Sequence, residues 1–173
     1  MRLTDYHDGA QWACGYSASS PFTASGTLVV GSVPAGQSIG EWTSLPSFMC
    51  SGPLGIVHTV TVGKLPWHLD ATAYDAASDT TTGMLTGLSF HWVGLGSTVD
   101  FDGPGGAGSG TGSLPFSYDN AAHLLTLNGG GALEAYNVTG TDLGLLDDGD
   151  PVGLDATMPV TPAQTIRPDG VTG

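Results

Sequence analysis

Aspartate residues beside glycine form the densest group of potential ligands in the sequence. Asp147, Asp148 and Asp150 lie in the run DDGD, and Asp100 and Asp102 lie in the run DFDG. Ca²⁺ prefers oxygen ligands, above all carboxylates that stand close together. Neither run has the spacing of an EF-hand loop, and acidic turns are common in an acidic β protein. We interpret the DDGD run as a candidate calcium site, with an ordinary solvated turn as the simpler alternative.

The histidines offer acid–base groups, but no local motif supports catalysis. Nucleophilic catalysis needs a nucleophile within reach of an oriented base, and the sequence contains neither a GxSxG elbow nor an HExxH zinc motif. His68 and Asp70 lie two residues apart in a predicted strand, where they could share a ligand cluster with His91 or Asp100. A polar cross-strand ladder facing solvent is the favoured interpretation. A hydrolase that uses histidine and carboxylates is the enzymatic alternative.

Four tryptophans are candidate ligand-facing aromatics. Tryptophan combines a large apolar ring with a polar N–H group and is therefore common at binding surfaces. The pattern does not place all four in one core stripe, so some are candidates for binding a sugar or a partner protein. Burial of all four in the core is the favoured alternative. They are Trp12, Trp42, Trp67 and Trp92.

The sequence contains two cysteines, Cys14 and Cys50. Neither belongs to a CxxC motif, and a metal site with two cysteines would need further ligands. In the chain-entropy model, a bridge between them closes a loop of about 35 residues and contributes roughly 4 kcal/mol. We favour a disulfide, and with it an oxidising compartment, over two free thiols.

The stretch from Cys50 to Trp92 must position many of these residues, and its pattern predicts three consecutive antiparallel strands. Residues 56–62 and 67–74 alternate between apolar and polar side chains, which is typical of strands. The polar run at 75–83 predicts a loop. A third alternating run follows, in which Met84, Thr86, Leu88, Phe90 and Trp92 are expected to share one face.

The rest of the chain predicts the same kind of structure. The 28 glycines and 11 prolines favour turns over helices. We expect about nine or ten strands in one antiparallel β sandwich or barrel, a single domain over residues 1–173. Residues 1–10 and 162–173 are expected to be frayed termini. Residues 94–112 are expected to include a flexible glycine-rich loop.

Charge excludes several classes of partner. Three Lys and Arg residues stand against 16 Asp and Glu, which gives a net charge of −13. Such a surface repels nucleic-acid phosphates and anionic lipids, and no apolar stretch is long enough to insert in a membrane. The N-terminal sequence MRLTDYHDGAQW lacks the apolar core of a signal peptide. An exported protein would have lost its leader, and a cytoplasmic protein is the alternative.

The run CSGPLGIVHTVTVGKLPWHLDATAYDAASDTTTGMLTGL resembles an uncharacterised family of secreted all-β proteins of actinobacteria. The shared pattern is Cys-x-GPLG, a valine–threonine strand, LPW and TTG, followed later by YNV and MPVTPAQTI. The resemblance covers about residues 11–166 and implies an exported domain in which Cys14 is bridged to Cys50. Relatives carry a second cysteine pair near the positions of residues 94–96 and Gly140, which this sequence lacks. They also have a signal peptide and an additional first strand.

These observations favour a non-enzymatic extracellular module that binds a protein or a carbohydrate, or assembles on a surface. The alternatives are the hydrolase described above and a structural subunit of a larger particle or fibre, which would suit an acidic, glycine-rich chain. A homo-oligomer is compatible with both the binding and the structural interpretation. We expect no cofactor other than the candidate calcium ion.

Overall fold

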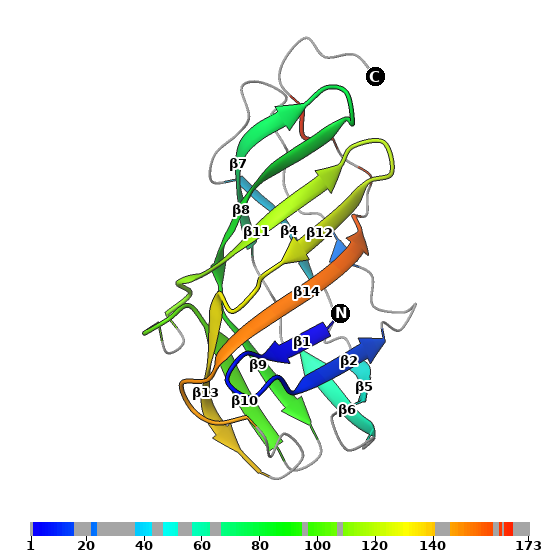
Figure 1. Cartoon of the computed structure of the whole chain (residues 1–173). Coiled ribbons are helices and arrows are strands. Elements are labelled where there is room, and N and C mark those ends of the chain that lie inside the picture. Colours follow the sequence, from blue (N-terminus) through cyan, green and yellow to red (C-terminus); the bar gives the residue numbers. More distant parts are fainter. Residues whose placement is uncertain are drawn as a thin grey trace.

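The computed structural model of the protein is built from β-strands alone in the part of the chain that it describes (Figure 1). All of the strand pairings are antiparallel, which confirms the all-β antiparallel class. No helix among these residues is long and apolar enough to cross a bilayer. The described residues are 2–15, 22–23, 37–42, 47–51, 57–62, 67–94, 97–106, 109–140, 146–160, 163 and 165–167.

Fourteen strands occur in these residues, where the sequence predicted about nine or ten. The additional strands include the short β1, β3 and β5, and one predicted run is divided into β8 and β9. The strands are β1 (Arg2–Asp5), β2 (Gln11–Gly15), β3 (Phe22–Thr23), β4 (Gln37–Trp42), β5 (Ser47–Ser51), β6 (Val57–Val62), β7 (Trp67–Asp75), β8 (Thr80–Leu88), β9 (Phe90–Gly94), β10 (Ser97–Asp102), β11 (Gly112–Asp119), β12 (Leu124–Asn128), β13 (Leu133–Thr139) and β14 (Pro151–Pro159).

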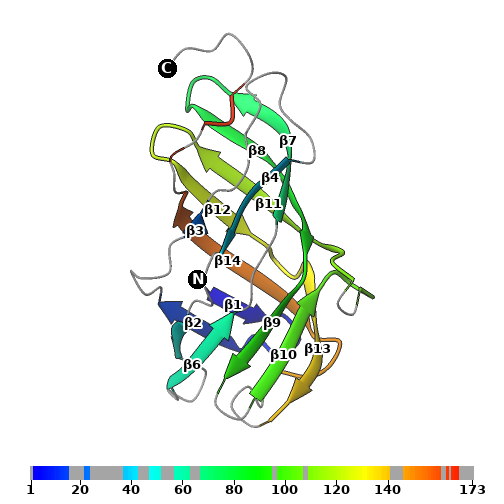
Figure 2. The ribbon, with the colours of Figure 1, turned by 180° about the vertical axis from the view of Figure 1, so that it is seen from behind.

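Strand β14 connects two groups of strands. The hydrogen-bonded order is β1-β2-β5-β6-β9-β10-β13-β14-β12-β11-β8-β7-β4-β3, and β1 also pairs with β14. Val152 stands opposite both Asp5 of β1 and Leu133 of β13, so these two strands flank opposite edges of β14. In Figures 1 and 2, β14 runs obliquely between the group of β7, β8, β11 and β12 and the group of β2, β6, β9, β10 and β13.

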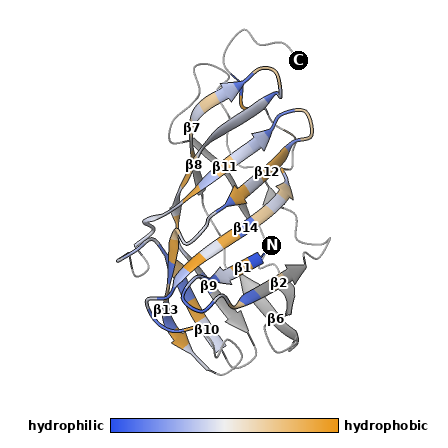
Figure 3. Cartoon of the chain, viewed as in Figure 1, coloured by the Kyte–Doolittle hydropathy of each residue, from blue (hydrophilic) through white to orange (hydrophobic). Residues whose placement is uncertain are grey.

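Alternating side chains build the core. In β11, Leu114, Phe116 and Tyr118 are buried, whereas Pro115 is exposed. The predicted inward residues of the last strand, from Leu154 to Val160 in steps of two, are all buried. Figure 3 shows apolar and hydrophilic residues alternating along the strands. The period of two therefore places one apolar face of each strand against the core.

The face predicted for residues 84–92 is wrong at its start. Met84 is 37% exposed, whereas Leu85 and Leu88 are fully buried. Thr86 pairs with Ser113 of β11 and Leu88 pairs with Gly112, so Gly87 is an extra residue between them. Gly87 has a φ of 78°. One extra residue in a strand reverses the faces on its far side. The bulge at Gly87 therefore brings both leucines inward.

The N-terminal residues predicted to fray are part of the sheet. Strand β1 pairs with β2 along one edge and with β14 along the other, and Leu3 is fully buried. At the other end, Ile166 is 3% exposed and belongs to the core. The expected loop at 94–112 also contains the strand β10.

The backbone register suits the predicted disulfide. Cys14 of β2 stands directly opposite Cys50 of β5. Opposite Cα atoms of antiparallel strands lie about 4.5–5.5 Å apart, within the separation that a disulfide spans. The structure describes the backbone of both residues but not their side chains, so the bridge stays a prediction.

Candidate functional site

The four tryptophans considered as ligand contacts have described backbones only. Trp12 lies in β2 opposite Leu3, and Trp92 lies in β9 opposite Val99. Trp42 ends β4 and Trp67 begins β7. Their side chains lie outside the described part of the structure, so their role as ligand contacts stays a prediction.

The aspartates of the DDGD run bind local backbone groups. Asp148 Oδ1 accepts a hydrogen bond of 2.7 Å from the amide of Val138, and Asp150 Oδ2 accepts one of 2.7 Å from the amide of Asp147. Asp147 and Asp148 are exposed, whereas Asp150 is buried. Within the described ranges, no three His, Cys, Asp or Glu side chains are grouped so that they could hold a metal ion.

His91 and Asp100 pair with each other, without the two residues, His68 and Asp70, with which the sequence suggested a shared cluster or ladder. They are opposite residues of β9 and β10, and His91 Nδ1 hydrogen-bonds to Asp100 Oδ1. Asn137 of β13, which has a φ of 52°, donates to Asp100 Oδ2 at 2.7 Å. The backbones of His68 and Asp70 pair with β8 instead. The pairing of His91 with Asp100 orients a histidine on an exposed face of the sheet.

Asp102 explains how the glycine-rich segment after β10 is held. Its side chain is fully buried and accepts hydrogen bonds from the amides of Gly103, Gly110, Thr111 and Gly112 and from the hydroxyl of Thr111. Burial alone would raise the pKa of Asp102, but these donors outweigh it and hold the pKa below its usual value. The carboxylate is therefore an anchor for the backbone at both ends of the segment.

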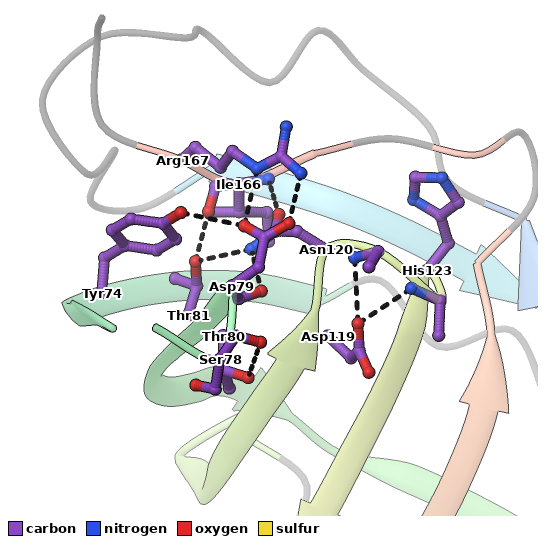
Figure 4. A network of polar contacts seen from close by, with 12 residues as sticks. Tyr74, Ser78, Asp79, Thr80, Thr81, Asp119, Asn120, His123, Ile166 and Arg167 are labelled. Carbon is purple, nitrogen blue, oxygen red and sulfur yellow. Dashed lines mark hydrogen bonds and ion pairs between the residues drawn. The ribbon is translucent and has the colours of Figure 1, made fainter. Parts of the chain in front are cut away.

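A second network fastens the C-terminal residues to the sheet (Figure 4). Asp79 accepts two hydrogen bonds from the guanidinium of Arg167 and one from the hydroxyl of Tyr74. Asn120 accepts a bond of 2.6 Å from the amide of Ile166, whose carbonyl accepts one from Thr81. The Arg167 hydrogen bond is the main cause that lowers the pKa of Asp79. These bonds assign the network a structural role.

The best-formed open surface lies on the outer side of four neighbouring strands, β11, β12, β14 and β1. Ser117, Thr126 and Thr157 form one row across three strands, and Asn128, Asp155 and Arg2 form the next row. Figure 1 shows these strands side by side. We call this surface the tyrosine face and define it by Arg2, Tyr6, Pro115, Ser117, Thr126, Asn128, Asp155 and Thr157.

Two open hollows meet on the tyrosine face. The first has a volume of about 570 Å³ and lies over β11, β12 and the turn at 129–132. The second has a volume of about 490 Å³ and lies over β12, β14 and β1. Thr126 and Asn128 line both hollows. The two hollows are shallow and adjoin at these residues, and we refer to them together as the groove.

Tyr6 stands at one end of this groove with about half of its surface exposed, at 51%. Its ring lies against glycines: a Cβ atom added to Gly153 would lie 2.5 Å from Tyr6 Cε2, and one added to Gly131 would lie 3.6 Å from Cδ2. The Tyr6 amide donates a hydrogen bond of 2.8 Å to the carbonyl of Pro151. Glycine at position 153 therefore provides the space in which the ring rests, whereas a Cβ atom at position 131 would make ordinary van der Waals contact with it.

The tyrosine face carries little uncompensated charge. The Arg2 guanidinium donates to Asp155 Oδ2 at 2.8 Å, and this hydrogen bond, followed by the charge of Asp155, raises the pKa of Arg2. Thr126 and Thr157 share a hydroxyl–hydroxyl hydrogen bond of 3.1 Å. The groove therefore offers hydroxyls, an amide, one ion pair and an exposed aromatic ring.

Sequence reasoning missed this surface because Tyr6 lies in a segment expected to fray. The glycine that makes room for the ring is Gly153, and a single glycine within a predicted strand gave no signal of this contact. No family model, curated protein sequence or solved structure matches the chain. The assignment of a function therefore depends on the geometry of the protein itself.

Proposed function

We propose that the protein is a non-enzymatic extracellular module that binds a neutral polysaccharide along the tyrosine face. The observation that carries the proposal is the half-exposed ring of Tyr6, which lies on a glycine surface at one end of a groove lined by hydroxyl and amide groups. An aromatic ring offers an apolar surface to the C–H face of a sugar. The threonine, serine and asparagine groups can each donate and accept hydrogen bonds with sugar hydroxyls.

Charge favours a neutral ligand over an acidic one. The net charge of −13 repels polyanions, and the guanidinium groups of Arg2 and Arg167 are both paired with aspartates. Lys64 lies outside the described residues. An uncharged sugar does not need a positively charged side chain for binding, because its hydroxyl groups hydrogen-bond with the polar groups of the groove.

The extracellular location rests on the resemblance to secreted actinobacterial proteins and on the facing positions of Cys14 and Cys50. A disulfide persists in an oxidising compartment. We expect the intact mass of protein taken from its native source to be unchanged after alkylation without a reductant. A gain of two alkyl groups would show free thiols and contradict the extracellular assignment.

A sedimentation assay with microcrystalline cellulose, chitin and starch granules tests the binding proposal. We expect at least one of these neutral polysaccharides to retain the wild-type protein, and Tyr6→Ala to lose retention, while Tyr6→Phe keeps it because the ring remains. His91→Ala is the matched control, because His91 is also exposed but lies on β9 and lines neither hollow. Polygalacturonate, an acidic polymer, is expected not to compete.

Two outcomes would refute the proposal. One is that none of the three polysaccharides retains the protein. The other is that Tyr6→Ala is retained as well as the wild type. Release of reducing ends from a retained polysaccharide, lost in His91→Asn, would instead favour the hydrolase alternative centred on the His91–Asp100 pair.

A further inference from the structure

The carboxyl group of Asp5 is buried with one oxygen unsatisfied. Asp5 is the last residue of β1 and has no exposed surface. Its Oδ1 accepts a hydrogen bond of 2.7 Å from the amide of His7. Its Oδ2 is buried and has no hydrogen-bond partner. An ionised carboxylate in this position is costly, because burial removes its water and nothing replaces the lost bonds.

The charged groups around Asp5 increase that cost. Asp8, in the turn after β1, and Asp150, just before β14, both repel a negative charge on Asp5. The basic side chain of His7 is directed to Asp150 instead, with its Nδ1 3.4 Å from Asp150 Oδ1, and it is 70% exposed. Arg2, at the other end of β1, is paired with Asp155. Burial is the main cause that raises the pKa of Asp5. Repulsion from the two aspartates raises it further, whereas the hydrogen bond from the His7 amide lowers it.

The same residue closes the turn that carries Tyr6. The Asp5 amide donates to the Ala10 carbonyl, and the Asp5 carbonyl accepts from the Gly9 amide, both at 2.9 Å. With the bond from the His7 amide to Oδ1, Asp5 makes three bonds that hold residues 6–9. An ionised Asp5 gains water only if this turn opens, and Tyr6 is the first residue of the turn.

We propose that Asp5 holds a proton in the folded protein at low pH and that this proton keeps the turn at residues 6–9 closed, so that Tyr6 is positioned for binding in acidic solution and released as the pH rises. The coupling to binding rests on the function proposed above, whereas the proton site rests on Asp5 and its surroundings alone. A proton satisfies Oδ2 by turning it into a hydroxyl, which can donate to a neighbouring carboxylate. This assigns Asp5 the role of a pH-sensitive latch.

The sign of the pH effect follows from the raised pKa of Asp5. The folded protein binds the proton more tightly than the unfolded chain, so the stabilisation is complete below the ordinary pKa of an aspartate. It is lost as the pH rises through the pKa of the folded state. The folding equilibrium constant falls about tenfold for each unit by which the pKa of Asp5 in the folded protein exceeds its pKa in the unfolded chain.

Carboxyl ¹³C NMR of the intact protein, titrated from pH 2 to pH 8, tests the proton site. Asp5→Asn identifies the Asp5 resonance and has nearly the same shape. We expect the Asp5 resonance to titrate with a midpoint above the ordinary aspartate value of about 3.9. A midpoint at or below that value would overturn the proposal. So would a shift of this resonance by millimolar CaCl₂ at pH 7, because a cation rather than a proton would then be the partner of Asp5.

Polysaccharide retention between pH 3 and pH 8 tests the coupling, using whichever of cellulose, chitin or starch retains the wild type. We expect wild-type retention to fall as the pH rises through the Asp5 midpoint, and Asp5→Asn to bind equally well at each pH. Asp75→Asn is the control for charge, because Asp75 is exposed and is the last residue of the distant strand β7. The same pH dependence in Asp5→Asn would overturn the coupling. A raised Asp5 midpoint without retention on any polysaccharide would refute the proposed function and support the proton site.

Discussion

Two buried aspartates in this protein have opposite surroundings. Asp5 and Asp102 both have no exposed surface. Asp102 accepts hydrogen bonds from four backbone amides and one hydroxyl, whereas Asp5 accepts one amide bond and leaves Oδ2 unsatisfied. The pKa of Asp102 is lowered and that of Asp5 is raised. Burial alone therefore does not decide whether a carboxyl group is charged, because the number of donors can reverse its effect.

Replacing Asp102 should produce the largest change in stability. Asp102→Ala leaves the buried amides of Gly103 and Gly112 without their acceptor. We expect the free energy of unfolding at pH 7 to fall by about 3–4 kcal/mol, since each buried donor without a partner costs about 1–3 kcal/mol. Urea unfolding measures this change. A loss below about 1 kcal/mol would show that water accepts the hydrogen bonds in place of the carboxylate. The difference between the surroundings of Asp102 and Asp5 would then matter less for stability than the geometry indicates.

Replacing Asp5 should raise the free energy of unfolding at neutral pH, the opposite of the effect of replacing Asp102. Asp5→Asn removes the charge and keeps the acceptor for the His7 amide. We expect this variant to be more stable than the wild type at pH 8 by about 1–3 kcal/mol, the usual cost of a buried group without a partner. The same urea experiment at pH 8 measures the gain. A variant less stable than the wild type would indicate that the ionised form of Asp5 is the favoured one.

The pH profile of stability should separate the two residues. The pKa of Asp102 is lowered, so its contribution is present above the ordinary aspartate pKa and is lost as the pH falls through the folded value. The contribution of Asp5 is present in acid and is lost as the pH rises through its raised value. Asp102→Asn should flatten the acid side of the profile, and Asp5→Asn the side toward neutral pH. Unfolding curves of the three proteins from pH 2 to pH 8 check this, and a swapped pattern would contradict both assignments.

Moving Tyr6 without altering Asp5 should have the smallest effect on stability. In Gly153→Ala the new methyl group meets the ring of Tyr6 and displaces it. We expect a loss of about 1 kcal/mol in unfolding free energy, as for modest overpacking, and polysaccharide binding weaker by about tenfold. Urea unfolding and retention assays measure the two effects. Unchanged binding would show that Tyr6 is not the sugar contact, even if the Asp5 latch is real.

Most of the correct predictions about the fold came from the alternation of apolar and polar side chains along each strand. Leu114, Phe116 and Tyr118 share the buried face that their period of two predicts, because each strand buries one face whatever its neighbours are. The bulge at Gly87 was not predictable, because its position depends on the register with β11. Strand β1 was missed because four residues carry too weak a pattern, and its order comes from pairing with β14.

The candidate site was less predictable than the fold. The surroundings of Tyr6 depend on Gly131 and Gly153, which are distant in sequence. The DDGD aspartates show a second limit, since their spacing suggested a cation and gave no sign that Asp148 and Asp150 accept hydrogen bonds from nearby backbone amides. Asp5 carried no signal, because a single aspartate in RLTD gives no hint that its carboxyl group is buried.

The pairing of β1 with β14 also determines when the protein can finish folding. Arg2 and its partner Asp155 are 153 residues apart in the chain, so Asp155 is synthesised long after Arg2. At about 5–20 residues per second, β1 waits several seconds for its neighbour to emerge. The nascent chain meanwhile exposes an unmatched strand edge, which is a target for chaperones and a starting point for aggregation. The rate at which β1 enters the sheet is therefore limited by the meeting of two segments that lie far apart in the chain.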